Sequence, residues 1–406
     1  MNKNKIFNDP VYGFITIPGQ RIFDIIDHPW FQRLRRIKQL GLTDLIYPGA
    51  LHTRFHHALG AMHLMGTALN RLKAKGHNIS DEEAEAAQMA ILLHDSGHGP
   101  FSHALENTLL SQVHHEKLSM LFMNKLNKEM NGALDLTIKM FRNNYKRKFF
   151  HQLISSQLDI DRLDYLKRDS FFTGVMEGTI GEDRIIKMLD VVNDSLVVEE
   201  KGIYSIENFL SSRRLMYWQV YLHKTTVSVE KMLIQIITRA QDLCRQGKAL
   251  NTSLALSLFL EREVKYTDIE KDEKYFNAFV TLDDFDIWSA IKAWQHHEDK
   301  ILSTLCSNLL ARRLFKIQIS NSPFDTKTVE KVRKELIKKY NFNIEELEYF
   351  LIKGTISNAA YVPVGETINI LTKRGEVIDV AQASDLPNIK AISKIVKKHY
   401  LCYPKL

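Results

Sequence analysis

Apolar residues recur three and four positions apart along most of the chain between residues 20 and 315, which is the spacing of one buried face of an α-helix. Alternation of apolar and polar residues, which is typical of strands, is confined to short stretches. One strand is expected at residues 14–17, and a hairpin at residues 196–206 with its turn at Lys201 and Gly202. The pattern therefore predicts a mainly α-helical protein with short β-hairpins.

The pattern changes after the stretch SNSPFD. A lysine-rich helix is expected next, and residues 367–383 predict a hairpin around Arg374 and Gly375. We therefore expect a helical core at residues 1–320 and a smaller C-terminal α+β region at residues 321–406.

The helix expected to begin at Ser80 leads to two polar residues at its far end. Ser80 and Glu83 have the spacing of a capping box, in which each side chain hydrogen-bonds the other residue's backbone N–H. The apolar stripe of this helix continues to His94, which should therefore face the interior. A single histidine there is usually a hydrogen-bonded core residue. Asp95 changes this interpretation, because burial of a carboxylate is costly unless the group is paired or binds a metal.

A second predicted helix, at residues 53–69, carries two adjacent histidines. His57 shares its face with alanine and leucine residues, whereas His56 shares its face with polar residues. His57 is therefore expected to point inward and His56 to lie at the surface.

A third predicted helix, at residues 154–169, contains four aspartates. Most of them should be solvated charges on an exposed face. Asp161 differs because it falls on the apolar stripe of the helix, where an aspartate needs a cation nearby.

Two histidines and two aspartates from these three helices would form a site with mixed nitrogen and oxygen ligands if they met in the interior. Such a site suits Fe, Mn, Zn or Ni better than an ion that prefers oxygen alone. The three cysteines, Cys244, Cys306 and Cys402, lie far apart in the sequence, so neither a disulfide framework nor a zinc ribbon is indicated. Any metal would therefore be held by histidine and carboxylate.

The composition is that of an ordinary globular protein, with 45% apolar and 25% charged residues in a chain of 406. Its net charge of +7 fits a partner that carries phosphate, either a nucleotide or a nucleic acid, although the same charge can serve solubility alone. No stretch has the length and apolarity of a signal peptide or a membrane-spanning helix, so a cytoplasmic location without membrane contact is expected.

The chain resembles the HD-domain phosphohydrolases in five stretches that occur in order, namely FNDPVYGFITI, FQRLRRIKQLG, RFHHALG, LLHDSGHGPFSH and DIDRLDYLKRD. The similarity is to the dNTP triphosphohydrolase branch, which includes bacterial dGTPase-like enzymes, and it covers about residues 5–320. It implies an HD-domain helical bundle whose motif region spans about residues 50–170. It also implies hydrolysis of a deoxynucleoside triphosphate at the α-phosphorus, which releases the deoxynucleoside and intact triphosphate.

The resemblance implies a role for each polar residue of the motifs. The metal ligands would be His57, His94, Asp95 and Asp161, the same four residues that the helical periodicity directs inward. The catalytic residues would be His115, oriented by Glu106, together with His98 and His103, which would contact the phosphate or the ester oxygen.

Substrate-binding residues follow from the same resemblance. Arg54 and Arg162 would pair with phosphate oxygens, for which planar guanidinium groups are well suited. Gln39 and Asp169 match positions that hold the 3′-hydroxyl of the sugar. Tyr165 matches a position that packs against the 2′ carbon and excludes a ribose hydroxyl. Mg or Mn would accompany the nucleotide.

Arg213, Tyr217, Tyr221 and Lys224 form one stripe at helical spacing, which is plausible as a wall for the base and the phosphates. Arg213 and Tyr221 match the family, whereas Tyr217 departs from it. An aromatic stripe more often marks core packing.

Some members of the family are homotetramers activated by GTP or dGTP at a site between subunits. Asp27, Gln32 and Arg35 match positions that contact the guanine there, and Arg312 and Lys316 match activator-phosphate positions more loosely. We therefore expect a homotetramer with a guanine nucleotide activator. The alternative for these charges is an exposed helix with paired side chains.

Two other functions remain compatible with the sequence. An HD-type nucleotidase or cyclic-dinucleotide phosphodiesterase would keep the metal site and change the substrate. A nucleic-acid-binding regulator would use the basic surface, and weak nucleic-acid binding is compatible with the charge.

Overall fold

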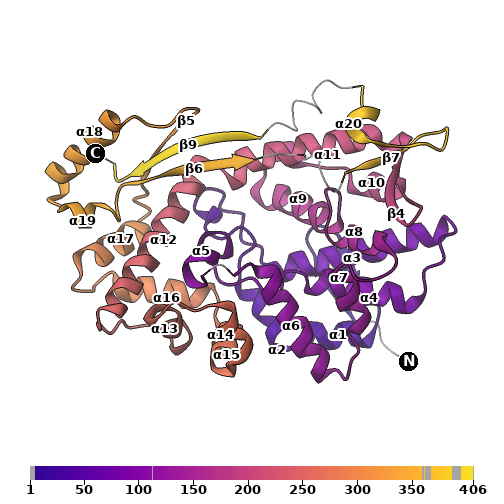
Figure 1. Ribbon diagram of the computed structural model, residues 1–406, viewed down its shortest axis with the longest axis horizontal. Helices are drawn as coiled ribbons and strands as arrows, with labels where there is room; N and C mark the ends of the chain where they lie inside the picture. Colours follow the sequence, from indigo (N-terminus) through magenta and orange to yellow (C-terminus); the bar gives the residue numbers. More distant parts are fainter. Residues whose placement is uncertain (1–4, 112, 359–360, 362–366, 386–394, 406) are drawn as a thin grey trace.

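Figure 1 shows the computed structural model of the protein, which describes residues 5–111, 113–358, 361, 367–385 and 395–405. Within these residues helices predominate, and the strands form small sheets of two, four and three strands. The predicted mainly α-helical fold with short β-hairpins is therefore confirmed.

The helices pack around two hydrophobic cores, which lie side by side and share α6 (His115–Glu129). The first core is built mainly by α1 (Gln20–Asp27), α2 (Pro29–Gln32), α3 (Arg54–Ala74), α4 (Asp81–Leu93), α7 (Asp135–Phe141), α8 (Lys148–Ile154), α9 (Ile160–Thr173), α10 (Glu182–Met188), α11 (Ile203–Met216) and α20 (Val380–Ala383). The second is built mainly by α5 (Ser102–Leu109), α12 (Lys224–Arg245), α13 (Leu254–Glu261), α14 (Tyr266–Lys271), α15 (Glu273–Thr281), α16 (Asp284–Trp294), α17 (Lys300–Leu310), α18 (Thr326–Tyr340) and α19 (Ile344–Leu347).

Helices α3 and α4 lie against each other in the first core, and α9 crosses α3. α3 is buried along most of its length, and its small residues Ala58, Gly60 and Ala61 leave room for the neighbouring helices. The capping box predicted at the start of α4 is confirmed, because Oγ of Ser80 accepts a hydrogen bond from N of Glu83 at 3.1 Å and Oε2 of Glu83 accepts one from N of Ser80 at 2.9 Å.

Two short hairpins lie beside the first core. The strand predicted at residues 14–17 is present as β2 (Gly13–Thr16), which pairs with β1 (Ile6–Asp9). The hairpin predicted at residues 196–206 is wrong, because β4 (Ser195–Glu199) pairs with the preceding β3 (Leu189–Val192).

The turn of this hairpin explains the error. It lies at Asn193 and Asp194, whose φ angles of 49° and 63° suit a two-residue hairpin turn. Asparagine and aspartate tolerate that conformation better than most residues. Gly202 instead precedes α11, which begins at Ile203.

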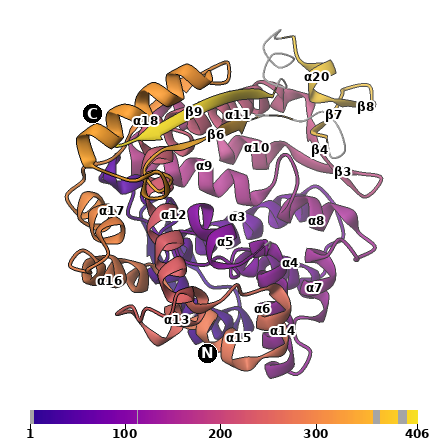
Figure 2. The same ribbon diagram turned by 60° about the vertical axis from the view of Figure 1, so that its left-hand side comes forward.

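The C-terminal part contains the lysine-rich helix predicted there, α18, and the predicted hairpin, formed by β7 (Asn369–Leu371) and β8 (Val377–Asp379). Its strands also pair with earlier parts of the chain. β7 runs parallel to β4, and β9 (Val396–Tyr403) lies between β6 (Ile352–Asn358) and β5 (Lys316–Ser320). Figures 1 and 2 show α18 beside this three-stranded sheet. The domain boundary near residue 320 stays a prediction, and strand pairing crosses it.

Every helix in the described part of the chain is too short or too polar to cross a lipid bilayer.

Candidate active site

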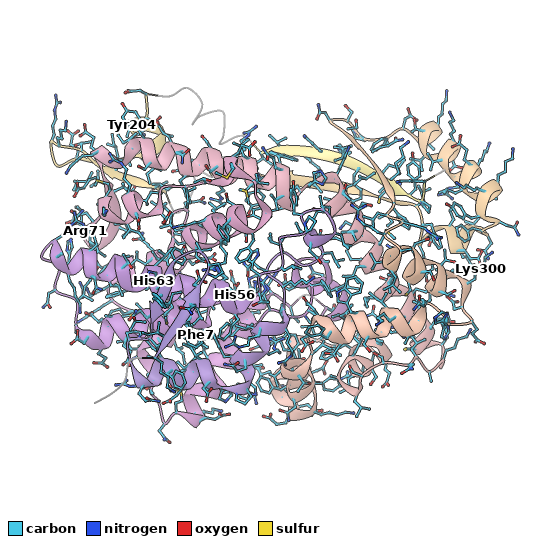
Figure 3. The ribbon with its side chains drawn as sticks, turned by 180° about the vertical axis from the view of Figure 1, so that it is seen from behind. Phe7, His56, His63, Arg71, Tyr204 and Lys300 are labelled. Carbon is cyan, nitrogen blue, oxygen red and sulfur yellow. The ribbon has the colours of Figure 1, made fainter. Side chains whose placement is uncertain are left out.

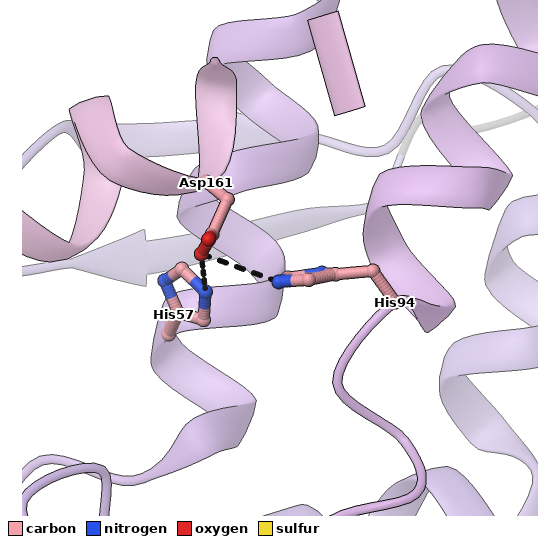
Figure 4. A group of neighbouring side chains, drawn as sticks. All are labelled: His57, His94 and Asp161. Atoms are coloured by element: carbon pink, nitrogen blue, oxygen red, sulfur yellow. Dashed lines mark hydrogen bonds and ion pairs between the residues drawn. The ribbon is translucent and has the colours of Figure 1, made fainter. Parts of the chain in front are cut away.

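Four side chains from three helices meet at one point in the first core. His57 lies in the first turn of α3, His94 caps the C-terminus of α4, and Asp161 lies in the first turn of α9. Nε2 of His57 is 3.0 Å from Oδ1 of Asp161, and Nε2 of His94 is 3.3 Å from the same oxygen (Figure 4). Asp95 lies beside them, with Oδ1 at 3.3 Å from Nε2 of His94 and Oδ2 at 3.8 Å from Nε2 of His57.

The two histidine rings present the nitrogen that a metal would need. Nδ1 of His57 hydrogen-bonds with Oδ2 of Asp164 at 2.7 Å, and Nδ1 of His94 hydrogen-bonds with the carbonyl of Ile91 at 2.6 Å. These partners hold a proton on Nδ1 and leave Nε2 as the ligand atom. Nε2 of His57 is buried and faces the carboxylates without hydrogen-bonding geometry. Ligand atoms about 3 to 4 Å apart fit an ion with bonds of about 2.1 Å. The residues therefore fit a divalent transition metal.

The histidines and carboxylates of this cluster shift each other's pKa values. Burial disfavours the charged form of His57, but the Asp161 and Asp164 carboxylates outweigh it and raise the pKa of His57 to about 10. Burial likewise works against the charged form of Asp161, but the His57 and His94 side chains hold the pKa of that carboxyl well below its usual range. A cation bound at Nε2 would take the place of a proton there, so metal binding and protonation of His57 would compete.

A chain of buried ion pairs supports His57 from behind. Asp164 receives Nε of Arg168 at 2.9 Å, and Nη1 of Arg168 reaches Oδ2 of Asp9 in β1 at 2.8 Å. Burial opposes ionisation of Asp164, but Arg168 and His57 lower its pKa to about 2. The ligand is therefore fixed through Arg168 to the N-terminal hairpin, although neither Asp164 nor Arg168 is predicted as a site residue by the sequence pattern.

The expectation that most aspartates of this segment are solvated is wrong. Asp159, Asp164 and Asp169 are each at most 1% exposed, whereas Asp161, the one predicted to face inward, has a side chain 26% exposed. The buried aspartates each have a partner that offsets the cost of burial. The helix also begins later than predicted, since Oδ1 of Asp159 accepts from N of Arg162 at 2.7 Å and so caps α9.

His56 has a structural task at the start of α3 (Figure 3). Its Nδ1 accepts from N of Thr53 at 3.2 Å and lies 2.9 Å from the hydroxyl of the same residue. The ring is half-buried, so the expected surface position is wrong, and the reason is this capping contact. The choice of His57 as the inward histidine agrees with its complete burial.

Two further histidines stack beside the cluster. The rings of His98 and His115 lie 3.8 Å apart at an angle of 17°. Oε1 of Glu106 lies 3.0 Å from Nδ1 of His115 and accepts from the backbone N of that residue at 2.6 Å. Nε2 of His98 is 3.2 Å from Oδ1 of Asp95, and Nδ1 of His98 hydrogen-bonds with Ser102. The backbone of His103 belongs to α5, but its side chain lies outside the described part of the structure.

The turn that carries His98 is held by Arg33 and by α6. Arg33 is fully buried, and its guanidinium donates to the carbonyls of Ser96, His98 and Leu282 at 2.8 to 3.0 Å. Gly97 is required there, because a Cβ would lie 2.2 Å from N of Ser119. The turn is thus fixed on both sides.

A cavity of about 740 Å³ opens from this cluster, between the two cores. Its lining includes most of the predicted site residues, namely Gln39, Arg54, His94, Asp95, His98, His115, Asp161, Arg162, Tyr165, Asp169 and Tyr221. Both arginines already have an anionic partner: Nη1 of Arg54 is 2.5 Å from Oδ2 of Asp95, and Arg162 pairs with Asp159.

Asp169 is fixed by two residues in this wall. Its Oδ1 is 2.7 Å from Nε2 of His52, and its Oδ2 accepts from the hydroxyl of Tyr221 at 2.7 Å. His52 is buried and stacks on Phe172 at 4.5 Å. The sequence gives no signal for His52, because it lies in a loop whose partners are distant along the chain.

The aromatic stripe of the sequence does not lie on one helix. α11 ends at Met216, residues Tyr217–Tyr221 form a π-helical turn, and α12 begins at Lys224. Tyr217 and Tyr221 line the cavity, Arg213 lies behind it and donates to Gln157 at 3.3 Å, and Lys224 is exposed. π-helical turns are frequent at functional sites, and this one brings two tyrosines to the wall.

The residues predicted to bind an activator lie outside the cavity lining. Asp27, Arg35, Arg312 and Lys316 are exposed, and Gln32 is half-buried. Nε of Arg35 donates to Oε1 of Gln32 at 2.7 Å, and its guanidinium lies 3.6 Å above the ring of Phe55. Nε of Arg312 donates to the carbonyl of Leu45 at 2.9 Å.

Two regions of the chain match models of known protein families. Residues 54–169 match the family model of the HD domain, and residues 180–254 match the model of the HD associated region. The first match begins at Arg54 and ends at Asp169, so it contains all four candidate metal ligands.

Proteins similar to this chain include YwfO of Bacillus subtilis, which is 32% identical and is aligned over 100% of this chain and 93% of its own length. A crystal structure of a phosphohydrolase from Bacteroides thetaiotaomicron superposes with a TM-score of 0.96 at 51% identity, covering 99% of this chain and 100% of that one. A deoxynucleoside triphosphate triphosphohydrolase SAMHD1 homolog of Dictyostelium discoideum is 30% identical over 67% of this chain and 57% of its own length. The chain belongs to the HD-domain phosphohydrolases.

Proposed function

We propose that the protein hydrolyses deoxynucleoside triphosphates to the deoxynucleoside and inorganic triphosphate, with a divalent transition metal. The observation that carries this proposal is that one cavity of about 740 Å³ is lined by candidate metal ligands, by the stacked His98 and His115, and by Asp169 with its tyrosines. The metal ligands would act on the phosphate, the stacked histidines would serve proton transfer, and Asp169 with its tyrosines would hold the sugar.

His57, His94, Asp95 and Asp161 would hold the metal, and Fe, Mn, Zn or Ni match this set of imidazoles and carboxylates. When bound, such an ion lowers the pKa of water and offsets the charge that develops on phosphoryl oxygens. Burial and then the positive charge of Arg54 hold the pKa of His98 well below its usual range. A neutral His98 beside Asp95 would add no positive charge next to the metal ligands.

His115 is the residue best arranged to carry a proton. Glu106 accepts from Nδ1 of His115, so Nε2 is the nitrogen that can exchange a proton on the cavity side. In the proposed reaction the Pα–O5′ bond breaks, the oxygen of a water joins the α-phosphorus, His115 gives a proton to O5′ of the leaving deoxynucleoside, and the proton that the water loses restores the histidine. The carboxylate of Glu106 would stabilise the positive charge of the His115 ring while the ring carries this proton.

The sugar would lie against Tyr165 and Asp169. Gln39 and Asp169 are buried polar groups in the wall and offer hydrogen bonds to a 3′-hydroxyl. The ring of Tyr165 lies 6.2 Å from that of Tyr221, edge to face at 73°, and the ring of Tyr165 offers an apolar surface against which a deoxyribose would pack. The printed name of the Dictyostelium relative, a deoxynucleoside triphosphate triphosphohydrolase, supports this substrate class.

We further propose activation by GTP or dGTP in a homotetramer. The support is the exposed Arg35, which bonds the half-buried Gln32 and whose guanidinium stacks on Phe55 and offers a flat platform to a base; Asp27 is exposed as well. Light scattering with and without GTP tests the assembly, and a monomer under both conditions would contradict it.

The experiment that tests the proposed reaction uses single dNTPs with Mn or Mg, with and without GTP, and identifies the phosphorus product. Triphosphate is expected, whereas orthophosphate or pyrophosphate indicates a nucleotidase or another phosphohydrolase. No turnover combined with tight nucleic-acid binding favours the binding protein. In the double variant His94→Ala, Asp95→Ala turnover should disappear, and persistent activity would mean that the metal site is misassigned.

A further inference from the structure

The far wall of the cavity carries a carboxyl group that the proposed reaction does not use. Thr226 and Glu230 lie four residues apart on α12, so they share one face of the helix, and both line the cavity. α12 packs against α5, and the lining of the cavity also includes the apolar residues Leu40, Leu42 and Leu222.

Glu230 is a half-buried residue of this wall. Its carboxyl has no hydrogen bond or ion pair with any residue that the structure describes. A half-buried carboxyl without a hydrogen bond costs stability, and burial, which the charge of the neighbouring Lys231 offsets only in part, raises the pKa of Glu230 to about 7. A group of this kind in a cavity wall is typical of a ligand contact.

If the proposed function holds, the other walls of the cavity bind the phosphates and the sugar of the nucleotide. The wall formed by Thr226 and Glu230 is then left for the nucleobase. The metal ligands, Arg54 and Arg162 surround the phosphate end, and Asp169 marks the sugar. α12 starts just after Tyr221, the hydrogen-bond partner of Asp169, and rises about 1.5 Å per residue away from it. The wall of Leu222, Thr226 and Glu230 therefore lies beyond the sugar, where the nucleobase belongs.

We propose that Glu230 contacts the nucleobase and makes guanine the preferred base of the substrate. An ionised carboxylate only accepts hydrogen bonds, through two neighbouring oxygens. Guanine presents two adjacent N–H donors on its N1 and N2 edge, whereas adenine and cytosine present a donor beside an acceptor and thymine presents one donor between two carbonyls. The hydroxyl of Thr226 donates to the carbonyl of Val220 at 3.2 Å, so it too offers an acceptor to the base.

The test is a competition between dGTP and dATP in one reaction mixture. At equal concentrations the ratio of their initial rates equals the ratio of their kcat/KM values, and the state of any activator site cancels because both substrates meet the same enzyme. The wild-type protein should consume dGTP faster. The amide of Glu230→Gln presents a donor beside an acceptor, so it would set an N–H donor against an N–H donor of guanine. This variant should lower the ratio of dGTP to dATP hydrolysis by about tenfold or more, because unpaired buried polar groups weaken binding strongly.

Two control variants separate this contact from a structural effect. Glu230→Asp keeps the carboxylate and should keep the preference for dGTP, although both rates can fall. Glu261→Gln makes the same chemical change at the exposed end of α13 and should leave the ratio unchanged. Because the ratio is independent of how much enzyme is folded, a less stable Glu230→Gln protein still gives a reading.

The inference is overturned if the wild type shows no preference for dGTP, or if Glu230→Gln slows both substrates equally. The proposed function fails separately, if no dNTP releases triphosphate. In that case competition of dGTP and dATP for equilibrium binding, compared between wild type and Glu230→Gln, still decides whether Glu230 contacts the base.

Discussion

Nδ1 of His57 lies 2.7 Å from Oδ2 of Asp164, and neither side chain is exposed to solvent. This contact fixes the tautomer and the direction of the ring whose other nitrogen faces Asp161 at 3.0 Å. Asp164 in turn is held by Arg168, which is fully buried. The candidate metal ligand His57 is therefore positioned by residues outside the proposed ligand set.

The first prediction concerns this supporting contact. Asp164→Asn keeps the shape of the side chain and removes its charge, so the affinity for the metal should fall about 10- to 100-fold. Titration of the chelator-treated protein with Mn, followed by calorimetry, measures this. Asp183→Asn, an exposed change on α10, is the matched control and should bind Mn as the wild type does. Equal affinities in all three proteins would show that Asp164 does not orient His57.

The second prediction uses two glycines of α3. A Cβ at Gly60 would lie 2.0 Å from Nη2 of Arg168 and 2.1 Å from Oδ1 of Asp164, so Gly60→Ala should displace the buried pair and cost about 1–3 kcal/mol of stability. A Cβ at Gly66 would lie 2.6 Å from Nε2 of Gln88, the far end of a flexible side chain that can move aside. Thermal unfolding and metal content should therefore separate Gly60→Ala from a near-normal Gly66→Ala. A reversed order of the two variants contradicts the packing described.

Much of the geometry of the candidate metal site can be predicted from the sequence because its signals are local. The face of a helix follows from residues three and four apart, and this is enough to choose His57 over His56 and to direct His94 inward. The supporting partners cannot be predicted in this way. Asp9 and Arg168 are 159 positions apart, and His52 and Asp169 are 117 apart, so only the tertiary fold brings them together.

The same distinction explains the errors. The aspartates of α9 look like solvated charges because their partners are invisible to periodicity. The hairpin turns at Asn193 and Asp194, which both have positive φ, whereas the expected turn residues Lys201 and Gly202 belong to a short 3₁₀-helix before α11. The stripe from Arg213 to Lys224 assumes a continuous helix, which the π-helical turn at Tyr217–Tyr221 interrupts.

A third prediction compares two adjacent histidines. The side chain of His115 is 29% exposed and bonds Glu106 at 3.0 Å, whereas that of His114 is 71% exposed and lies 3.9 Å away from the same oxygen. His115→Gln should lower kcat about 10²- to 10⁴-fold with little change in metal content, because a proton carrier is lost. His114→Gln should keep kcat near that of the wild type. Similar losses in both variants would remove His115 from the proposed mechanism.

A fourth prediction concerns pH and the buried Asp284. Its carboxylate accepts from N of Lys38 at 2.9 Å and N of Phe101 at 3.0 Å, and burial raises the pKa of Asp284 to about 7. In the unfolded chain the pKa is about 4, so the folded state binds the proton more tightly. The stabilising contribution of this group is therefore complete below about pH 4 and is lost as the pH rises to about 7.

Denaturation with urea at about pH 5 and about pH 8 checks this. The free energy of unfolding of the wild type, relative to that of Asp284→Asn, should be lower at the higher pH, since the amide does not titrate. A constant difference between the two proteins across this range would mean that Asp284 does not hold a proton in the folded state.

The most direct test of the proposed reaction follows the oxygen that enters the product. With dGTP, Mn and GTP in water enriched in ¹⁸O, attack at the α-phosphorus predicts triphosphate that carries one ¹⁸O and deoxyguanosine that carries none, both read by mass spectrometry. Label in the deoxyguanosine, or release of orthophosphate or pyrophosphate in place of triphosphate, would contradict the account.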